Sequence, residues 1–180
     1  LPRSTSYASD WEYWDKDSTS VFASLEHQFD NGWKVNLSAY KVWAKLNMLG
    51  HYIRSNVTAG TYDLLNALNE HEENQSSYGL FASGPFKLLG REHELVLGAG
   101  HRRVEFDGNT NQGGLMASNI DLYNFDPSAI ARPDLTILPW LDSDIKEFNA
   151  YATTRLNLAD GLKLIAGGRL DWYDYSDAQP

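Results

Sequence analysis

Two short runs combine histidine with carboxylates and are the first candidates for metal chemistry. They are His71-Glu72-Glu73 and Arg91-Glu92-His93-Glu94. Neither run has the HExxH spacing, which places two imidazoles on one helical face around a metal ion. We therefore expect no metal site at either run. We expect Arg91 and Glu92 to order a turn through ion pairs instead.

A third run, from Asp107 to Gly113, resembles the beginning of a calcium-binding loop. Its second glycine comes one position late for such a loop, and Ser118 stands where the bidentate glutamate belongs. The sequence therefore favours a flexible loop tip over a calcium site.

No arrangement of side chains suggests an enzyme. The chain has no cysteine, which removes thiol catalysis, zinc ribbons and disulfides together. No serine is paired with a plausible histidine–carboxylate relay, so a nucleophile is lacking as well. We expect a binding or transport protein.

Bulk composition excludes two further classes. The formal net charge is −9 and the pI is about 4.9, which argues against a nucleic-acid partner because phosphate binding needs clustered lysine and arginine. No apolar run approaches the ~18 residues that a membrane-spanning helix needs. Aromatic residues make up 13% of the chain and glycines are frequent, which favours an all-β protein.

Apolar and polar residues alternate in six segments, and this period of two predicts β-strands. The segments form three hairpins with short turns at Asp30–Gly32, Pro85–Arg91 and Asp160–Gly161. Pro85 cannot donate to a sheet ladder, so we expect the incoming strand to end there. The predicted strand pairs are 19–29 with 33–45, 76–82 with 93–106, and 150–158 with 162–172.

Long segments without alternation separate the hairpins. They are residues 1–17, 47–73 and 107–146, and we expect them to be loops, with a short helix over Thr61–Leu68 that Thr61 caps. Compact domains rarely contain structureless loops longer than ~15 residues. Outer-membrane barrels, in contrast, alternate short periplasmic turns with long extracellular loops.

The pattern predicts an all-β fold: an antiparallel transmembrane β-barrel segment of about six strands, with three hairpins joined by long loops. Strands of ~10–14 residues can cross the hydrocarbon layer when tilted. The alternative is a soluble or secreted antiparallel β-sheet domain that binds a ligand, such as a lipocalin-like barrel. The barrel segment places five apolar residues on one outward belt, whereas the soluble domain buries them in a closed core. They are Val21, Leu37, Leu97, Leu158 and Leu164.

Three runs resemble the barrel region of TonB-dependent ferric-siderophore receptors, in particular those for ferric pyoverdine, ferrichrome-type and coprogen-type siderophores. The most specific run extends from Ala82 to Gly98. The run from Leu162 to Trp172 resembles the Gly-Gly-Arg strand that follows a periplasmic turn, and the run from Leu25 to Lys34 is a third match. The three runs occur in the family's order and span most of the chain.

The resemblance implies a barrel of about 22 strands with a plugged lumen, in the cell outer membrane of a Gram-negative bacterium. The whole receptor would take up a ferric siderophore, energised by the TonB–ExbB–ExbD complex through the plug domain. Residues 1–180 would be part of that barrel, with the plug and the other strands absent. No cofactor is expected on the chain itself. Its surroundings would be membrane lipid and lipopolysaccharide.

The resemblance also implies a siderophore pocket made of aromatic side chains on loops and lumen-facing strand ends. Each candidate could instead pack within a loop or belong to a girdle at the membrane interface. For Trp33 and Trp172 we expect the girdle role. Aromatic faces suit a bulky chelate because stacking and cation–π contact tolerate its shape. The candidates all lie in the predicted extracellular regions, and they are Trp11, Trp14, Tyr123, Phe125 and Trp140.

Six strands from a much larger barrel cannot close on themselves and leave two exposed edges. As an isolated fragment, we expect a curved open antiparallel sheet that self-associates with a neighbouring copy at those edges.

Overall fold

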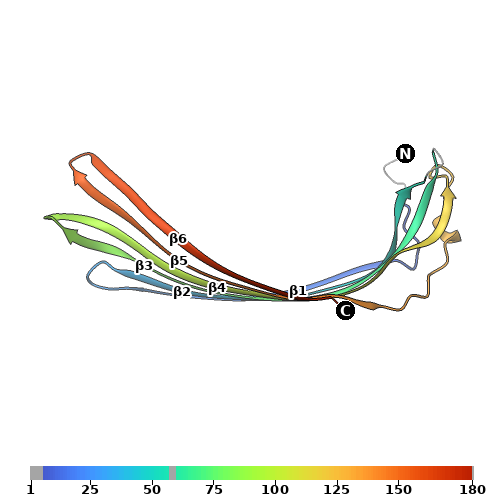
Figure 1. The fold of residues 1–180 in the computed structure, drawn as a ribbon, viewed down its shortest axis with the longest axis horizontal. Coiled ribbons are helices and arrows are strands. Elements are labelled where there is room, and N and C mark those ends of the chain that lie inside the picture. The colour runs from blue at the N-terminus through green and yellow to red at the C-terminus, as the bar shows by residue number, and fades with distance from the viewer. Residues whose placement is uncertain (1–5, 57–59, 180) are drawn as a thin grey trace.

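The computed structural model describes residues 6–56 and 60–179. Its six strands form a single antiparallel sheet in chain order, and the sheet is open and curved (Figure 1). Within these described residues, each outermost strand, β1 or β6, has one neighbour. The all-β barrel-segment prediction is confirmed. The strands are β1 (Tyr13–Gln28), β2 (Lys34–Ser55), β3 (Tyr62–Leu88), β4 (Arg91–Ile120), β5 (Leu138–Ala159) and β6 (Leu162–Ala178).

Three short turns join the strands into hairpins, as the alternation predicts. Gly32 and Gly161 have φ angles of 85° and 81°, and the middle turn places Leu89 and Gly90 at 51° and 75°. Positive φ at such positions matches the right-handed twist of the flanking strands. Arg91 of the middle turn pairs with Asp160 of the neighbouring turn at 3.0 Å, which confirms an ordering ion pair for Arg91.

The middle turn is shorter than predicted, because β3 continues through Pro85 to Leu88. The indole N–H of Trp33 donates to the carbonyl oxygen of Pro85 (3.1 Å), so that edge of Pro85 faces away from β4. The N–H and C=O of one strand residue point to the same side. The missing N–H of Pro85 would therefore also face away from β4. No hydrogen bond between β3 and β4 is lost at Pro85, and β3 continues past it.

The predicted long loops are wrong over most of their length. Residues 62–73 and 107–120 are paired strand, and the strands are 16 to 30 residues long. The short helix predicted over Thr61–Leu68 is also wrong, since β3 begins at Tyr62 and pairs with both neighbours there. Alternation fails in this part because Leu64, Leu65 and Leu68 are all buried, so that both faces of the strand are covered.

The run from Asp107 to Gly113 lies inside β4 and is therefore not a loop tip. The true connection between β4 and β5 is residues 121–137, which contain one 3-10 turn, η1 (Pro127–Ala129). Within residues 6–56 and 60–179, no helix is long and apolar enough to cross a membrane.

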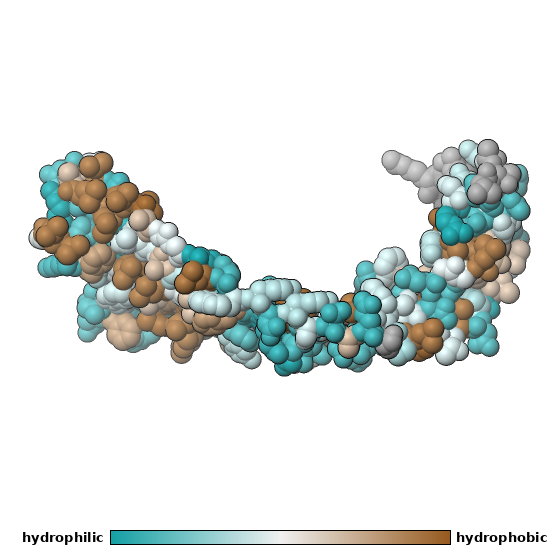
Figure 2. Space-filling view, viewed as in Figure 1, coloured by the Kyte–Doolittle hydropathy of each residue, from teal (hydrophilic) through white to brown (hydrophobic). Residues whose placement is uncertain are grey.

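One face of the sheet, called the outer face below, carries a continuous apolar band on the half near the short turns (Figure 2). Leu37, Leu97 and Leu164 lie on it and are 43 to 48% exposed. Val21 lies on the same face beyond the band, opposite Lys41, and is 53% exposed. Leu158 is also exposed and adjoins a bulge in β5. These side chains do not line a closed core, so the structure does not support the lipocalin-like alternative.

An aromatic row ends this band on the side away from the short turns. In cross-strand register the row contains Tyr78, His101, Phe148 and Trp172. The Phe148 and Trp172 rings lie 5.4 Å apart between centroids. Such a row is typical of the girdle of an outer-membrane barrel, and it includes Trp172 as the sequence predicts. We take the sheet between the short turns and this row as its membrane-crossing part.

Beyond the row the strands continue and bend, and the buried core lies there (Figure 1). Residues 6–12 and the 121–137 connection contact each other beside this end of the sheet: the Tyr7 hydroxyl donates to the Leu122 carbonyl (3.3 Å) and the Ser9 hydroxyl to the Pro127 carbonyl (2.9 Å). The buried apolar side chains here are Leu49, Leu64, Leu65, Ala67 and Leu68.

Candidate ligand-binding site

The opposite face of the sheet, called the inner face below, is mostly small or polar over the membrane-crossing part, with Phe81 and Tyr151 as larger members. One cross-strand row there reads Ser38, Gly79, Gly100 and Asn149. In the next row Arg102 lies opposite Ser77 and Glu147. Its guanidinium nitrogens are 3.4 Å from Oε2 of Glu147 and 3.4 Å from Oε1 of Gln75, which lies one row further along β3. A face of this kind suits water or protein and not lipid.

Three aromatic rings cluster on the inner face beyond the membrane-crossing part. His71 lies 5.3 Å from Phe106 and 5.9 Å from Trp140, measured between ring centroids. Trp140 meets Phe106 edge-on at 6.4 Å. A register shift at Gly108 and Asn109 introduces an extra residue on β5 and brings Trp140 beside the other rings. The cluster offers aromatic faces and edges to a ligand.

Gly108 makes room for this cluster. A Cβ at that position would approach Cε1 of Phe106 to 2.6 Å and Cε3 of Trp140 to 3.2 Å. Both distances are shorter than ordinary carbon contacts. The two rings can therefore occupy their places only because residue 108 has no side chain.

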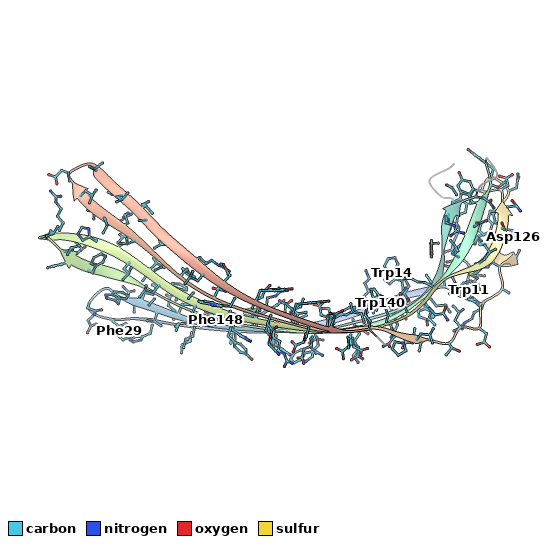
Figure 3. The ribbon with its side chains drawn as sticks, viewed as in Figure 1. Trp11, Trp14, Phe29, Asp126, Trp140 and Phe148 are labelled. Carbon is cyan, nitrogen blue, oxygen red and sulfur yellow. The ribbon has the colours of Figure 1, made fainter. Side chains whose placement is uncertain are left out.

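An open hollow of about 280 Å³ adjoins His71 and Phe106. Lys16 and Glu73 bring a cation and a carboxylate to its wall. The Lys16 ammonium also lies 4.5 Å from the centroid of the Trp14 ring. Trp14 and Trp140 thus stand at the same level of the sheet, near the hollow (Figure 3). The wall also includes Ser18, Ala44 and Leu46.

Burial lowers the pKa of His71 below its ordinary value, because desolvation disfavours the charged imidazole. At neutral pH the ring is therefore uncharged, and its Nε2 is buried without a hydrogen-bond partner. Within the described parts of the chain, no three His, Asp or Glu side chains are placed to hold a metal ion. The site is suited to binding a preformed complex by stacking and by charge.

The structure separates the five aromatic candidates. Trp14 and Trp140 belong to the inner-face site, and Tyr123 is exposed in the 121–137 connection. Trp11 donates its indole N–H to the carbonyl oxygen of Ile130 (2.8 Å), and Phe125 packs 5.9 Å from Tyr7. Trp11 and Phe125 therefore hold residues 6–12 and the 121–137 connection together. Figure 3 shows Trp11 near the bent end of the sheet.

Sequence reasoning missed Lys16, His71 and Phe106 as members of the site. A signal was available, because the register of the β3–β4 hairpin is fixed by its turn. Continued without a break, that register brings Glu73 opposite Phe106 and His71 opposite Gly108. The bulge that adds Trp140 has no comparable signal in the sequence.

This geometry agrees with a family comparison. The sequence profile described as "TonB dependent receptor-like, beta-barrel" matches residues 1–179. The chain belongs to the TonB-dependent receptor-like β-barrel family. Members of this family are receptors and transporters and not enzymes, and they are β-barrel proteins of the outer membrane.

Similar sequences among TonB-dependent receptors are receptors for ferric pyoverdine. The chain is 30% identical to the ferripyoverdine receptor of Pseudomonas aeruginosa and covers 23% of that protein. It is 32% identical to the ferric-pyoverdine BN7/BN8 receptor of Pseudomonas putida, over 94% of this chain and 22% of that receptor. The chain thus spans less than a quarter of the length of these relatives.

Solved structures of the same family have the same fold. The crystal structure of the Pseudomonas aeruginosa outer-membrane ferripyoverdine receptor bound to ferripyoverdine aligns with all of this chain and with 24% of that one, at 26% identity and a TM-score of 0.82. The ferric preacinetobactin receptor BauA of Acinetobacter baumannii aligns with 95% of this chain and 26% of that one, at 13% identity and a TM-score of 0.80, which shows the fold alone.

Proposed function

We propose that the chain is part of the barrel of a TonB-dependent outer-membrane receptor that takes up a ferric siderophore of the pyoverdine class. The observation that carries this proposal is the match along the whole chain to receptors of ferric pyoverdine, at 30% identity. The aromatic and charged site on the inner face supports it, because a barrel closes with this face toward the lumen.

In this proposal Trp14 and Trp140 contact the siderophore, together with His71 and Phe106. Flat rings stack on the chelate, and Lys16 offers a cation to its negative groups. Trp11 and Phe125 act indirectly by ordering the extracellular segments, and Tyr123 is available for first contact from its exposed position. The siderophore brings its own ligands to iron, so the protein needs none, and the ferric complex is cargo and not a cofactor.

The remaining parts of the proposal concern the whole protein, in the cell outer membrane of a Gram-negative bacterium. Residues 1–180 contribute strands and extracellular segments, and the plug domain and the other strands lie elsewhere in the protein. The plug would connect the barrel to the TonB–ExbB–ExbD complex. The polar inner face, with pairs such as Arg102–Glu147, is suited to contact with such a plug. We assign no catalytic role to the chain.

The test is a titration of the purified receptor with ferric pyoverdine, followed by quenching of tryptophan fluorescence. Trp140→Ala should weaken binding about tenfold or more, because a stacked aromatic contact is worth roughly 1 kcal/mol beyond the buried area that is also lost. Trp172→Ala is the matched control, since Trp172 lies on the outer face in the aromatic row, and it should bind as the unchanged receptor does.

Two results would contradict the proposal. Failure of the unchanged receptor to bind any ferric siderophore would remove the function. Equal affinity of the Trp140 and Trp172 variants would leave the function but remove the inner-face site from it.

A further inference from the structure

One ring nitrogen of His71 is left without a partner in the middle of the inner-face site. Among the described residues, nothing forms a hydrogen bond with its buried Nε2. The rings of Phe106 and Trp140 lie beside it, at centroid distances of 5.3 and 5.9 Å. A buried nitrogen without a partner costs free energy in the unliganded receptor. A ligand that gives this nitrogen a partner removes that cost.

The imidazole of His71 can bring this nitrogen to a ligand. The hollow of about 280 Å³ adjoins His71, so one side of the ring borders open space. A half-turn about χ2 exchanges the two sides of the ring, and this torsion is broad and roughly two-fold in histidine. The turn costs little, because Nε2 has no hydrogen bond to break. It also has room, because Gly108 lies opposite His71 in register and has no side chain.

Two charged side chains face the ring on the described inner face. Lys16 belongs to the same cross-strand row, in which Lys16 lies opposite Leu46 and Leu46 opposite His71. At ~4.8 Å per strand, the Cα atoms of Lys16 and His71 stand about 10 Å apart. Glu73 is two residues along β3 and therefore about 7 Å away. The other side chains around the ring carry no charge, and they are Leu46, Phe106 and Trp140.

Two further charges reach the wall of the hollow from the outer face. Asp17 and Lys45 lie there, opposite each other in register. Lys45 is 2.5 Å from Oε1 of Glu72, and both side chains of that pair are exposed. Water therefore screens these charges from the ring. The charges that act on His71 are those of Lys16 and Glu73, which have opposite signs and oppose each other.

A bound chelate changes the balance between the charged and the uncharged ring. In the unliganded receptor burial lowers the pKa of His71, so the ring is uncharged at neutral pH. A negative oxygen of the chelate at hydrogen-bonding distance favours the imidazolium, and an opposite charge so close strengthens proton binding roughly ten- to a thousandfold. Removal of the last water from the ring acts in the opposite direction. The negative charge is the larger change, because the ring is already partly buried before the chelate arrives.

We propose that His71 takes up one proton when the ferric chelate binds, which couples the affinity of the site to the pH of the surrounding medium. The imidazolium donates from Nε2 to a negative oxygen of the chelate. The proton comes from the solvent, and the iron keeps the ligands that the siderophore provides. This inference rests on the proposed function, because the ligand is the ferric siderophore proposed above.

The direction of the pH effect follows from linkage between proton and ligand. Because the chelate holds the charged ring, the pKa of His71 is higher in the complex than in the unliganded receptor. The affinity is therefore highest at pH values below the pKa in the unliganded receptor. It falls as the pH rises through the pKa in the complex.

The test measures the affinity of the whole receptor in detergent for ferric pyoverdine between pH 8 and pH 5, by quenching of tryptophan fluorescence. The unchanged receptor should bind about tenfold more tightly at pH 5 than at pH 8. His71→Gln should lose this difference, because an amide does not titrate in this range. His71→Asn should lose it too, and it provides the same readout if His71→Gln does not fold. Comparison with these variants separates the proton on His71 from any titration of pyoverdine.

Calorimetry gives a second and direct readout. Titrations near pH ~6.5, the ordinary pKa of histidine, in two buffers of different ionisation enthalpy count the protons that binding takes up. The unchanged receptor should take up a proton fraction clearly above zero. The His71 variants should take up less by that fraction.

His101→Gln is the matched control, since it makes the same change at a histidine of the aromatic row on the outer face. It should keep the tenfold difference between pH 5 and pH 8. Glu73→Gln should keep a pH dependence as well, because the proton goes to His71 and not to the carboxylate.

Four outcomes would overturn the proton uptake by His71. They are an affinity of the unchanged receptor that does not change with pH, an affinity that rises with pH, equal pH dependence of the His71 variants and the unchanged receptor, and loss of the pH dependence in Glu73→Gln. Binding that is independent of pH would leave the proposed function intact. A receptor that binds no ferric siderophore at any pH would contradict the proposed function and the proton uptake together.

Discussion

At the scale of single residues, the inner-face site depends on a position without a side chain. Gly108→Ala should displace the rings of Phe106 and Trp140, because the new Cβ would lie 2.6 Å from Cε1 of Phe106. Overpacking of this kind costs typically 1–3 kcal/mol of folding free energy. Ferric-siderophore affinity should fall about tenfold as the rings leave their places. Urea unfolding in detergent and fluorescence titration measure the two effects.

Gly168→Ala is the control for this prediction. Gly168 is also in a strand, but no atom lies within 4 Å of the position its Cβ would take. This variant should change neither stability nor binding beyond about 0.5 kcal/mol. If Gly108→Ala changes stability and affinity as little as Gly168→Ala does, the rings of Phe106 and Trp140 are not packed against Gly108 as described.

A second residue-scale prediction concerns Asp63 near the end of the sheet away from the short turns. The Ser118 hydroxyl, 2.7 Å away, together with Arg54 and Asn56, lowers the pKa of this carboxyl below its ordinary value. A lowered folded-state pKa stabilises the fold above the unfolded-state pKa, near 3.9. That stabilisation is lost as the pH falls through the folded-state value.

Comparison of the unchanged receptor with the Asp63→Asn variant tests the direction of this pH dependence of stability. The variant should be less stable than the unchanged receptor at pH 7, and the difference should disappear as the pH falls below about 3.9. Urea unfolding at several pH values measures it. A difference that stays constant down to pH 2 would show that the charge of Asp63 contributes nothing.

At the scale of elements, the short turns are held together by a buried histidine. The Nδ1 of His93 accepts from the Asn157 N–H (3.0 Å), so Nε2 carries the hydrogen and donates to the Leu88 carbonyl (3.0 Å). His93 thus joins the β3–β4 turn to the bulge in β5. His93→Ala would leave both backbone groups without a partner, at a cost of about 2–3 kcal/mol in the free energy of unfolding.

Arg91→Gln provides the comparison, since it removes the ion pair to Asp160 on the same turns. Because that pair is exposed, its loss should cost under ~1 kcal/mol. Urea unfolding of both variants measures the loss of unfolding free energy in each, and the loss for His93→Ala should be the larger. Equal costs would show that the buried hydrogen bonds of His93 add nothing beyond a surface contact.

The elements near the turns could be predicted from the sequence, and those far from them could not. Val21 to Phe29 alternates because one face meets lipid and the other the lumen. Leu64 and Leu65 are consecutive and both buried, so a period of two is absent and a helix or loop fits the sequence equally well. The prediction that the strand ends at Pro85 failed for another reason. A proline ends a strand only where its missing N–H would face a neighbouring strand. The side that Pro85 presents follows from its contact with Trp33, which the sequence does not show.

The candidate site was predictable to a similar extent. The sequence proposed Trp14 and Trp140 from their residue type and their place in segments without alternation, and their contact with a ligand stays a prediction. Trp11 and Phe125 are aromatic too, but they pack between residues 6–12 and 121–137, and the Trp11–Ile130 contact joins positions 119 apart in the chain. No local pattern reports such a contact, so aromatic residues for ligand and for packing cannot be separated by sequence alone.

At the scale of the whole molecule, the sheet has two open edges. β1 has 16 residues and β6 has 17, and among residues 6–56 and 60–179 neither has a strand partner on its outer side. The unpaired N–H and C=O groups of such edges are a template for pairing with another chain. In the proposed barrel other strands cover both edges, whereas the isolated 180-residue chain exposes them.

We therefore expect the isolated chain to self-associate and the whole receptor not to. Light scattering after size-exclusion chromatography in detergent should show dimers or larger species of the isolated chain, increasing with its concentration. Backbone hydrogen exchange should become slower in β1 and β6 as association proceeds, and β3 should change little because both of its edges are already paired. A monomer at all concentrations, with fast exchange in β1 and β6, would contradict edge pairing. Slowed exchange in β3 instead would place the contact between apolar faces. The outer face carries the apolar band and is the other surface through which two copies could associate.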